Sequence, residues 1–280
     1  LRGRSVRFRL LAIALLPMLV ILPLLLGVAI YRWNARFDAT LISKVNGDLT
    51  IAHQYLARIL EKTGVQIRGW GLSFRFREVE ERETIAAVTE LLEQSRKEIG
   101  LDFLYLMDAS GKVVASSPAL AGTPRADWPI IASALSGESP STGIDIFSND
   151  ELAAISPDLA KRARLDLVPT PNAVPTDRST ATNGMVVHAA SRAVAPGGGP
   201  AALVGGILLN QNLEFIDTIN DLVYREASLP EGSKGTATLF LDDVRISTNV
   251  RLFEGRRALG TRVSAAVRST VMGEGRTWLD

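Results

Sequence analysis

The stretch "GTATLFLDDVRISTNV" at Gly235–Val250 decides the fold, because the chain carries nearly the same pattern once before. The earlier copy is "LDFLYLMDASGKVVASSP", at Leu101–Pro118. Each copy has a run of β-forming residues, a turn that contains aspartate and a second short β-forming run, which is the pattern of a β-hairpin. A single hairpin is common, so a duplication requires that the sequence after each hairpin also repeats.

The sequence after each hairpin does repeat. A helix-like stretch follows each one, "PIIASALSG" and then "SAAVRSTVMG", and each ends at a Gly-Glu pair. Asp108 lies 29 positions before Gly137, and Asp242 lies 31 positions before Gly273. A hairpin, a helix and a Gly-Glu pair at nearly equal offsets predict a duplicated αβ module. The pair Asp242 and Asp243 is interpreted as turn chemistry rather than as a cation site.

The first copy continues with two further predicted strands, "GMVVHAASRAV" at Gly184–Val194 and "ALVGGILLN" at Ala202–Asn210. They flank a glycine-rich loop, which predicts an antiparallel pair. The second copy has its hairpin, its helix and the start of a third strand, "RTWLD", before the sequence ends. We therefore expect a second module that is truncated, with Leu106 and Phe240 buried at matching positions of two separate antiparallel sheets.

The composition favours globular domains without a metal or nucleic-acid site. Of the 280 residues, 46% are hydrophobic and 22% are charged, which suits one or two folded domains. A net charge of +1 predicts no nucleic-acid partner. The chain has no cysteine, and its two histidines, His53 and His188, are 135 positions apart. We therefore expect no disulfide and no metal site.

Motifs of catalysis are also missing from the sequence. The glycine-rich stretches "GGILLN" and "GGGP" lack the lysine and the Ser/Thr of a phosphate-binding loop. No Gly-x-Ser-x-Gly nucleophile motif occurs. We therefore expect a non-catalytic region with no cofactor.

An uncharged apolar run near the start, Leu10–Ile30, predicts a membrane-spanning helix. A hydrocarbon core of about 30 Å needs about 20 helical residues, which this run supplies. The alternative is a cleaved signal peptide, whose apolar region would be about 7–15 residues long and would end at a small-residue site. The length of the run favours an uncleaved anchor, with residues 1–9 as a cytoplasmic tail and residues 10–31 as the span.

The flanking charges predict the orientation of this span. Arginines are more frequent before it than after it, which places the N-terminus in the cytoplasm. Tyr31 and Trp33 fit an interfacial aromatic belt. We therefore expect a protein of the bacterial inner membrane whose residues after Tyr31 are periplasmic. The arginines concerned are Arg2, Arg4, Arg7 and Arg9 before the span, and Arg32 and Arg36 after it.

An apolar stripe predicts that the helix continues beyond the membrane as a stalk over residues 32–64, with Gly64 at its end. Such a helix can dock on its own domain, or it can join that domain rigidly to the membrane and form the seam of a homodimer. A second helix is predicted over residues 76–100, after a turn. The stripe recurs at steps of three and four residues: Trp33, Phe37, Leu41, Val45, Leu49, Ala52, Leu56 and Ile59.

Two stretches resemble a known family, "HAASRAV…LVGGILLNQNLEFIDTI" at His188–Ile219 and "TATLFLDDVRISTNVRLFEGRRALGTRVS" at Thr236–Ser264. With the span and the long helix, they resemble the extracytoplasmic double Cache, or PAS-like, sensor region of bacterial sensor histidine kinases and chemoreceptors. The resemblance implies an α+β fold with antiparallel sheets, a membrane-distal Cache module at residues 65–227 and an incomplete membrane-proximal one at residues 228–280.

The same resemblance implies a function. The region would sense a small-molecule ligand and pass the signal across the membrane in a two-component system, most directly as part of a sensor histidine kinase. One alternative is the sensor region of a chemoreceptor. Another is a membrane-anchored extracytoplasmic binding or assembly protein without signalling output.

One segment, Ser139–Asn183, is longer than the ordinary loop that would join the first helix to the third strand. Within it, Ser156-Pro157-Asp158 predicts the start of a helix, because Ser is a favoured N-cap and Pro a favoured first residue. The stretch "LVPTPNAVPTDR" predicts extended chain. This insert is either a surface decoration or a lid or wall of a ligand pocket.

Five side chains of the first module are candidate ligand contacts. Side chains alternate along a strand, so the two candidates on the first strand share a face, and so do the two on the third. Arg192 offers a planar fork that suits a carboxylate, and Trp128 offers an aromatic wall. We therefore expect a small organic anion held by Arg192 with help from His188, unless Arg192 is a solvated edge residue and His188 a hydrogen-bonded core residue. The candidates are Tyr105, Met107, Trp128, His188 and Arg192.

Overall fold

The computed structural model describes residues 6–72, 85–137, 141–224, 235–252 and 255–278. The chain divides into two compact units, Leu1–Thr50 and Ile51–Trp278. Each is described by itself below. Every helix and strand that follows α1 in the chain belongs to the second unit.

A single helix, α1 (Val6–Gly71), includes the predicted span and the predicted stalk. Among the described residues, no helix meets the length and hydropathy needed to cross a membrane. Several side chains of the run Leu10–Ile30 lie outside the described set, namely those at positions 10–14, 16, 17 and 20.

The predicted end of the stalk at Gly64 is wrong, because α1 continues to Gly71. Gly64 is buried, and a Cβ at this position would collide with the hydroxyl of Thr142. The glycine therefore allows a close approach of helix and strand rather than ending the helix. The part of the second predicted helix before position 85 lies outside the described residues, and the rest is α3 (Ile85–Ile99).

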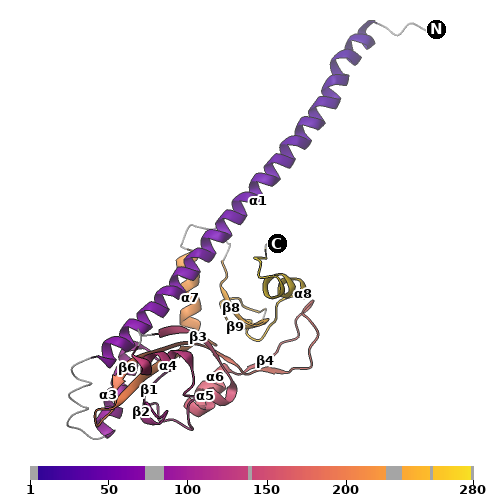
Figure 1. Ribbon diagram of the computed structural model, residues 1–280. Helices are drawn as coiled ribbons and strands as arrows, with labels where there is room; N and C mark the ends of the chain where they lie inside the picture. Colours follow the sequence, from indigo (N-terminus) through magenta and orange to yellow (C-terminus); the bar gives the residue numbers. More distant parts are fainter. Residues whose placement is uncertain (1–5, 73–84, 138–140, 225–234, 253–254, 279–280) are drawn as a thin grey trace. The chain divides into compact units, whose positions relative to one another are not determined.

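The core of the second unit is a five-stranded antiparallel sheet with the order β2-β1-β7-β6-β3 (Figure 1). The predicted hairpin and the predicted later strand pair account for four of these strands. The fifth, β3, was not predicted and comes from the insert. The strands are β1 (Phe103–Asp108), β2 (Val113–Ser117), β3 (Ser141–Phe147), β6 (Gly184–Val194) and β7 (Pro200–Leu208).

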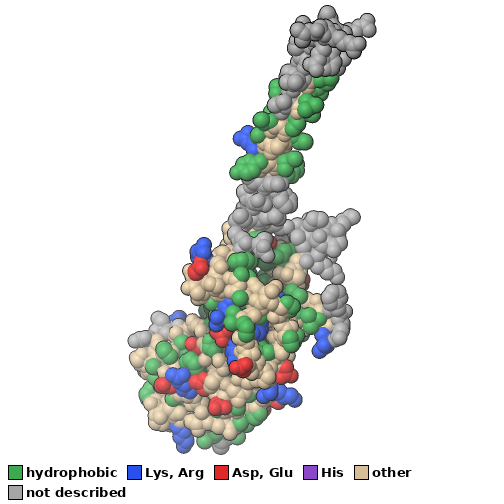
Figure 2. Space-filling view, turned by 90° about the vertical axis from the view of Figure 1, so that its right-hand side faces the viewer, with side chains coloured by type: hydrophobic (Ala, Val, Ile, Leu, Met, Phe, Trp, Pro, Cys, Tyr) green, Lys and Arg blue, Asp and Glu red, His purple; other side chains and the backbone are tan. Residues whose placement is uncertain are grey.

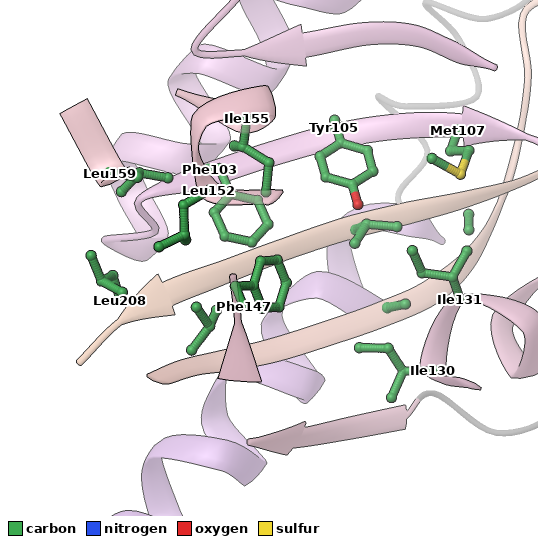
Figure 3. Close-up of a cluster of buried hydrophobic side chains, with 14 of the residues drawn as sticks. Phe103, Tyr105, Met107, Ile130, Ile131, Phe147, Leu152, Ile155, Leu159 and Leu208 are labelled. Carbon is green, nitrogen blue, oxygen red and sulfur yellow. The ribbon is translucent and has the colours of Figure 1, made fainter. Parts of the chain in front are cut away.

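Helices cover both faces of this sheet, since its side chains alternate between two apolar clusters. On one face, Phe103, Tyr105 and Met107 of β1 pack with α4, α5 and α6 (Figure 3). On the other face, Leu104 and Leu106 pack with α3 and with the end of α1. We call the cluster around Phe103, Tyr105 and Met107 the upper cluster. Its helices are α4 (Pro129–Ser136), α5 (Asn149–Ile155) and α6 (Pro157–Ala163), and the latter two belong to the insert.

The second predicted hairpin forms a sheet of its own, so the two hairpins are not part of one continuous sheet. It consists of β8 (Thr238–Leu241) and β9 (Val244–Thr248), and Asp242 in the turn has a positive φ of 51°, which aspartate tolerates. The helix-like stretch that follows is α8 (Ala265–Arg268) and one π-helical turn, η1 (Ser269–Gly273).

Burial at the two matching positions differs from the prediction. Leu106 is fully buried, as expected, but Phe240 is only partly buried. The guanidinium of Arg245 lies 5.4 Å from the centre of the Phe240 ring. The prediction for Phe240 is wrong because a two-stranded sheet does not enclose a side chain as the five-stranded sheet does.

The remaining elements belong to the insert and to the chain that follows β7. Two short strands of the insert, β4 (Leu165–Asp166) and β5 (Thr180–Ala181), pair with each other. Helix α7 (Leu213–Val223) follows β7, and the Arg257 guanidinium donates to both carboxylate oxygens of Asp217 on this helix, each at 2.7 Å. The helix start predicted at Ser156-Pro157 is confirmed by α6.

Two glycines in one row of the sheet differ sharply in the space around them. A Cβ at Gly206 would lie 2.7 Å from the Phe103 ring and 2.8 Å from the backbone oxygen of Val187, whereas a Cβ at Gly143 would meet nothing within 4 Å. We expect Gly206→Ala to lower the free energy of unfolding by about 1–3 kcal/mol, as overpacked cores do. Gly143→Ala should change it little. Chemical unfolding of both variants measures this, and equal effects would contradict the assigned packing.

Candidate functional site

The candidate site lies where β1, β7 and β6 form one row across the sheet. Phe103 is opposite Gly206 on β7, and Gly206 is opposite His188 on β6. Since Gly206 has no side chain, the ring of Phe103 lies over it, and the ring centres of Phe103 and His188 are 6.3 Å apart. The absence of a side chain on the middle strand therefore brings two side chains from different strands together.

His188 is enclosed by three aromatic rings, Phe103, Trp128 and Phe147, which we call the aromatic cage. The centre of the Phe147 ring is 5.1 Å from that of His188, and the centre of Trp128 is 5.7 Å away, both edge-on. Trp128 also stacks on Phe147 at 4.8 Å. His188 and Phe147 are buried, whereas Trp128 is partly exposed and forms the outer wall.

The polar partner of His188 is Asp145 on β3. The Nδ1 atom of His188 lies 2.9 Å from Oδ2 of Asp145, whereas its buried Nε2 atom has no hydrogen-bond partner among the described residues. An ionised carboxylate only accepts hydrogen bonds, so we assign the proton of the neutral ring to Nδ1. The Nε2 atom then presents an unpaired acceptor inside the aromatic cage.

Burial lowers the pKa of His188, and the hydrogen bond and charge of Asp145 offset only part of this effect. The neutral form is therefore favoured in the folded protein, because a charged imidazole would be desolvated. Burial also raises the pKa of Tyr105, which keeps its phenol protonated. The site is thus neutral at its centre, with the carboxylate of Asp145 at its side.

Four of the five predicted residues lie on one face of the sheet, either within the upper cluster or packed against it. Tyr105 and Met107 are buried members of the cluster, Trp128 packs against it, and His188 shares their face. Arg192 is on the same face of β6 but is exposed, and its guanidinium lies beside Gly137 at the end of α4. About 13 Å of strand separates Arg192 from His188, so the two do not meet.

Sequence reasoning missed Phe103, Asp145 and Phe147. Phe103 stands two residues before Tyr105, and the alternation that placed Tyr105 and Met107 on one face could have included it. Asp145 and Phe147 lie in the insert, where no strand was predicted. The alternating pattern of "IDIF" was the signal that a strand could follow.

A cavity of about 390 Å³ opens beside the same layer. It is lined by β2 and by the loop at residues 120–124. Val113 and Leu120 line this cavity and also pack against the upper cluster. The cavity therefore reaches the edge of the cluster that holds Tyr105 and Met107.

The burial of His188 predicts how stability depends on pH. The folded-state pKa of His188 is lowered, so this group contributes stability that is present above about pH 6.5 and is lost as the pH falls toward the folded-state pKa. We expect a lower melting temperature at pH 5.5 than at pH 7.5, and a smaller difference in His188→Gln. The matched control is His53→Gln, at the other histidine, which is exposed. An unchanged pH dependence in His188→Gln would contradict the assignment.

A family model matches the last quarter of the chain. Residues 207–280 match the family model described as single cache domain 3. The resemblance to a Cache sensor region is therefore confirmed. The matching residues, called the Cache segment below, begin in β7 and include α7, β8, β9 and α8. No curated protein matches this chain in sequence.

Several solved structures are similar to this chain, and their descriptions name a periplasmic domain, a sensor domain and ligand-binding domains. The periplasmic domain of Vibrio cholerae LuxQ is 12% identical, with a TM-score of 0.40, over 78% of this chain and 82% of that chain. The sensor domain of the V. cholerae histidine kinase DctB is 14% identical, with a TM-score of 0.44, over 76% and 68%. The ligand-binding domain of the Pseudomonas fluorescens chemoreceptor CtaA, in complex with L-serine, is 14% identical, with a TM-score of 0.31, over 76% and 73%.

Proposed function

We propose that this chain is the extracytoplasmic ligand-sensing region of a membrane-bound receptor, most directly of a sensor histidine kinase, and that it passes ligand binding across the membrane. The match of residues 207–280 to a Cache family supports a non-catalytic sensor. The uncharged run Leu10–Ile30 and the arginines before it support anchorage in the bacterial inner membrane with a periplasmic sensor. A chemoreceptor sensor region and an anchored binding protein without signalling output are the alternatives.

The observation that carries the ligand site is the unpaired Nε2 atom of His188. Buried polar atoms are nearly always hydrogen-bonded, so an unpaired one calls for a partner, which can be an ordered water or a ligand. The aromatic cage would supply apolar contact on three sides of that partner. Since Nε2 is an acceptor, the ligand presents an N–H or O–H group to it. Trp128, the partly exposed wall, is the side chain that has to move to admit the ligand.

The second contact of the ligand is proposed at Arg192. This side chain is exposed, carries a fixed positive charge and shares the face of His188. Tyr105 and Met107 would line the floor between the two, on β1. Since about 13 Å of strand separates Arg192 from His188, only an extended organic anion, with its hydroxyl or amino group far from its carboxylate, would reach both. A simple carboxylate without a donor group would reach Arg192 only.

Partners other than the ligand are proposed from exposed surfaces. Val45 and Leu49 of α1 expose 46% and 43% of their surface, which fits a homodimer through this helix, whereas contact with lipid is proposed for the run Leu10–Ile30. Figure 2 shows acidic and basic side chains interspersed over the face it displays, as expected for a net charge of +1. This pattern favours no nucleic-acid partner.

A thermal-shift screen of the full chain in mild detergent tests the function and the site. The library contains small carboxylates with and without a hydroxyl or amino group, and neutral and cationic compounds as controls. We expect hits among the carboxylates that carry a donor. His188→Gln and Arg192→Ala should each reduce the shift, whereas Arg164→Ala, an exposed arginine on the insert, should leave it unchanged.

The outcomes separate the parts of the proposal. A hit whose shift survives Arg192→Ala removes this arginine from the site. A hit whose thermal shift survives His188→Gln removes the aromatic cage from the proposed ligand site. Binding only of neutral or cationic compounds overturns the organic anion, and a complete absence of hits in the screen counts against the sensor function itself.

A further inference from the structure

The insert has a second contact surface, far along the chain from the aromatic cage. Its extended part, residues 165–178, which we call the arm, lies against the Cache segment rather than over the cage. Leu165 packs in a small apolar cluster with Val244 and Ile246 of β9. Figure 1 shows β4, at the start of the arm, on the side of the first sheet where β9 lies. The arm is therefore neither a free decoration nor a lid on the proposed ligand site.

Backbone hydrogen bonds fix the arm along the Cache segment. The N–H of Val168 donates to the carbonyl oxygen of Gly260 at 3.0 Å, and the N–H of Ala265 donates to that of Asn172 at 2.7 Å. A Cβ at Gly260 would collide with the backbone of Asp166, so a glycine is needed for this approach. The contact is continuous over the length of the arm and is not a single crossing point.

A buried ion pair lies at the centre of this contact. The side chains of Arg262 and Asp243 are 8% and 2% exposed, and Nη2 of Arg262 is 2.5 Å from Oδ2 of Asp243. Arg262 also binds the arm twice: its Nη1 donates to the carbonyl oxygen of Val174 at 2.6 Å, and its backbone N–H donates to Oγ1 of Thr170 at 3.0 Å. Burial of a charge is costly unless its donors are hydrogen-bonded, and the arm supplies two of the acceptors of Arg262.

The other end of the same insert builds the aromatic cage. Strand β3 supplies Asp145 and Phe147, and α5 and α6 follow it directly. The side chains of these two helices are buried in the upper cluster with the floor of the proposed site. The arm begins two residues after α6, which is tied to the sheet by the bidentate pair of Arg162 with Asp102, at 2.7 and 2.5 Å. A displacement of side chains at the aromatic cage would therefore be transmitted to the arm through these packed side chains.

We propose that the insert is the coupling element of this sensor: it links the His188 cage to β9 and to the residues that follow β9 through α5, α6 and the arm, which the Asp243–Arg262 pair holds in place. The coupling extends the proposed function and does not depend on the class of ligand. It requires that a change at either end alters the other, because coupling between two sites is reciprocal.

Hydrogen exchange on the full chain in mild detergent tests the coupling from the cage. Asp145→Asn removes the charge beside His188, and Asp150→Asn, an exposed aspartate at the start of α5, is the matched control in the same insert. We expect the cross-junction amides of Val168, Arg262 and Ala265 to change their exchange rates by about fivefold or more in Asp145→Asn, the lower end of typical coupling. Asp150→Asn should leave these rates unchanged.

The reverse experiment perturbs the junction and reads the cage. Thr170→Val keeps the shape of the side chain but removes the acceptor of the Arg262 N–H. We expect the midpoint of the His188 proton titration, followed by NMR of its ring, to move in Thr170→Val and to stay constant in Thr123→Val, an exposed threonine outside the insert.

Two results would overturn the coupling. Junction amides that exchange alike in Asp145→Asn and in the parent would show that the cage does not reach the arm. An unchanged titration midpoint of His188 in a folded Thr170→Val variant would show that the arm does not affect the cage. Either result leaves the ligand screen intact, so failure of the coupling and failure of the sensor function are distinguishable.

Discussion

Replacement of Asp243 by asparagine is expected to lower the free energy of unfolding by about 3–5 kcal/mol, since a buried charge is left without its partner. Arg262 would keep its charge in a position where only 8% of its side chain is exposed. Arg178 and Arg268 also face Asp243, at 3.5 and 3.8 Å, so the substitution leaves three guanidiniums around a neutral side chain. Chemical unfolding of the full chain in mild detergent measures the loss.

The matched control for Asp243→Asn is the same substitution at the preceding residue. Asp242 is exposed, and asparagine tolerates its positive φ of 51°. We expect Asp242→Asn to change the free energy of unfolding by less than about 0.5 kcal/mol, as surface substitutions usually do. If both variants lost the same stability, the turn rather than the ion pair would be the cause.

Phe147→Ala is the second substitution with a large expected effect, a loss of about 3–5 kcal/mol in the free energy of unfolding. Phe147 is 2% exposed and belongs to the upper cluster (Figure 3). The centre of its ring lies 4.8 Å from that of Trp128 and 6.3 Å from that of Phe103. Its removal would leave Trp128 without its stacked partner and open the aromatic cage to water. Calorimetry or chemical unfolding measures the loss, and tryptophan fluorescence reports the change around Trp128.

The neighbouring residue gives the control for Phe147→Ala. Ile146 is on the same strand but points to the opposite face, with 41% of its surface exposed. Its replacement by alanine should cost less than about 1 kcal/mol, because little apolar surface is lost from the interior. A similar cost at both positions would mean that the insert strand packs with a different register.

The sequence predicted the elements whose signals are local. Both hairpins, the later strand pair and the start of α6 follow from alternation, turn residues and helix caps within a few positions. The strand β3 was missed because Ile144 and Ile146 point away from the upper cluster and stay partly exposed, so the insert shows no long apolar run. Gly64 was misassigned because a glycine that ends a helix and a glycine that admits a neighbouring strand look alike in sequence.

The candidate site was predictable in part for the same reason. His188 is conspicuous as a polar residue in an apolar strand, and Trp128 as the aromatic residue before a helix. Asp145 is 43 positions away from His188, and only the pairing of β3 with β6 brings the two together. Strand alternation grouped Arg192 with His188, because it fixes the face of the sheet on which a side chain lies but not how deeply that side chain is buried.

The arm also sets the order in which this chain can complete its fold. Thr170 and Arg262, joined by a hydrogen bond, are 92 positions apart. At a synthesis rate of about 5–20 residues per second, the arm would leave the ribosome roughly 5–20 s before its partner residues. During that interval the first sheet and its helices can form from nearby sequence, whereas the arm has nothing to dock on. Closure of the arm on the Cache segment is therefore a late step of folding, and until then its extended backbone is open to proteases.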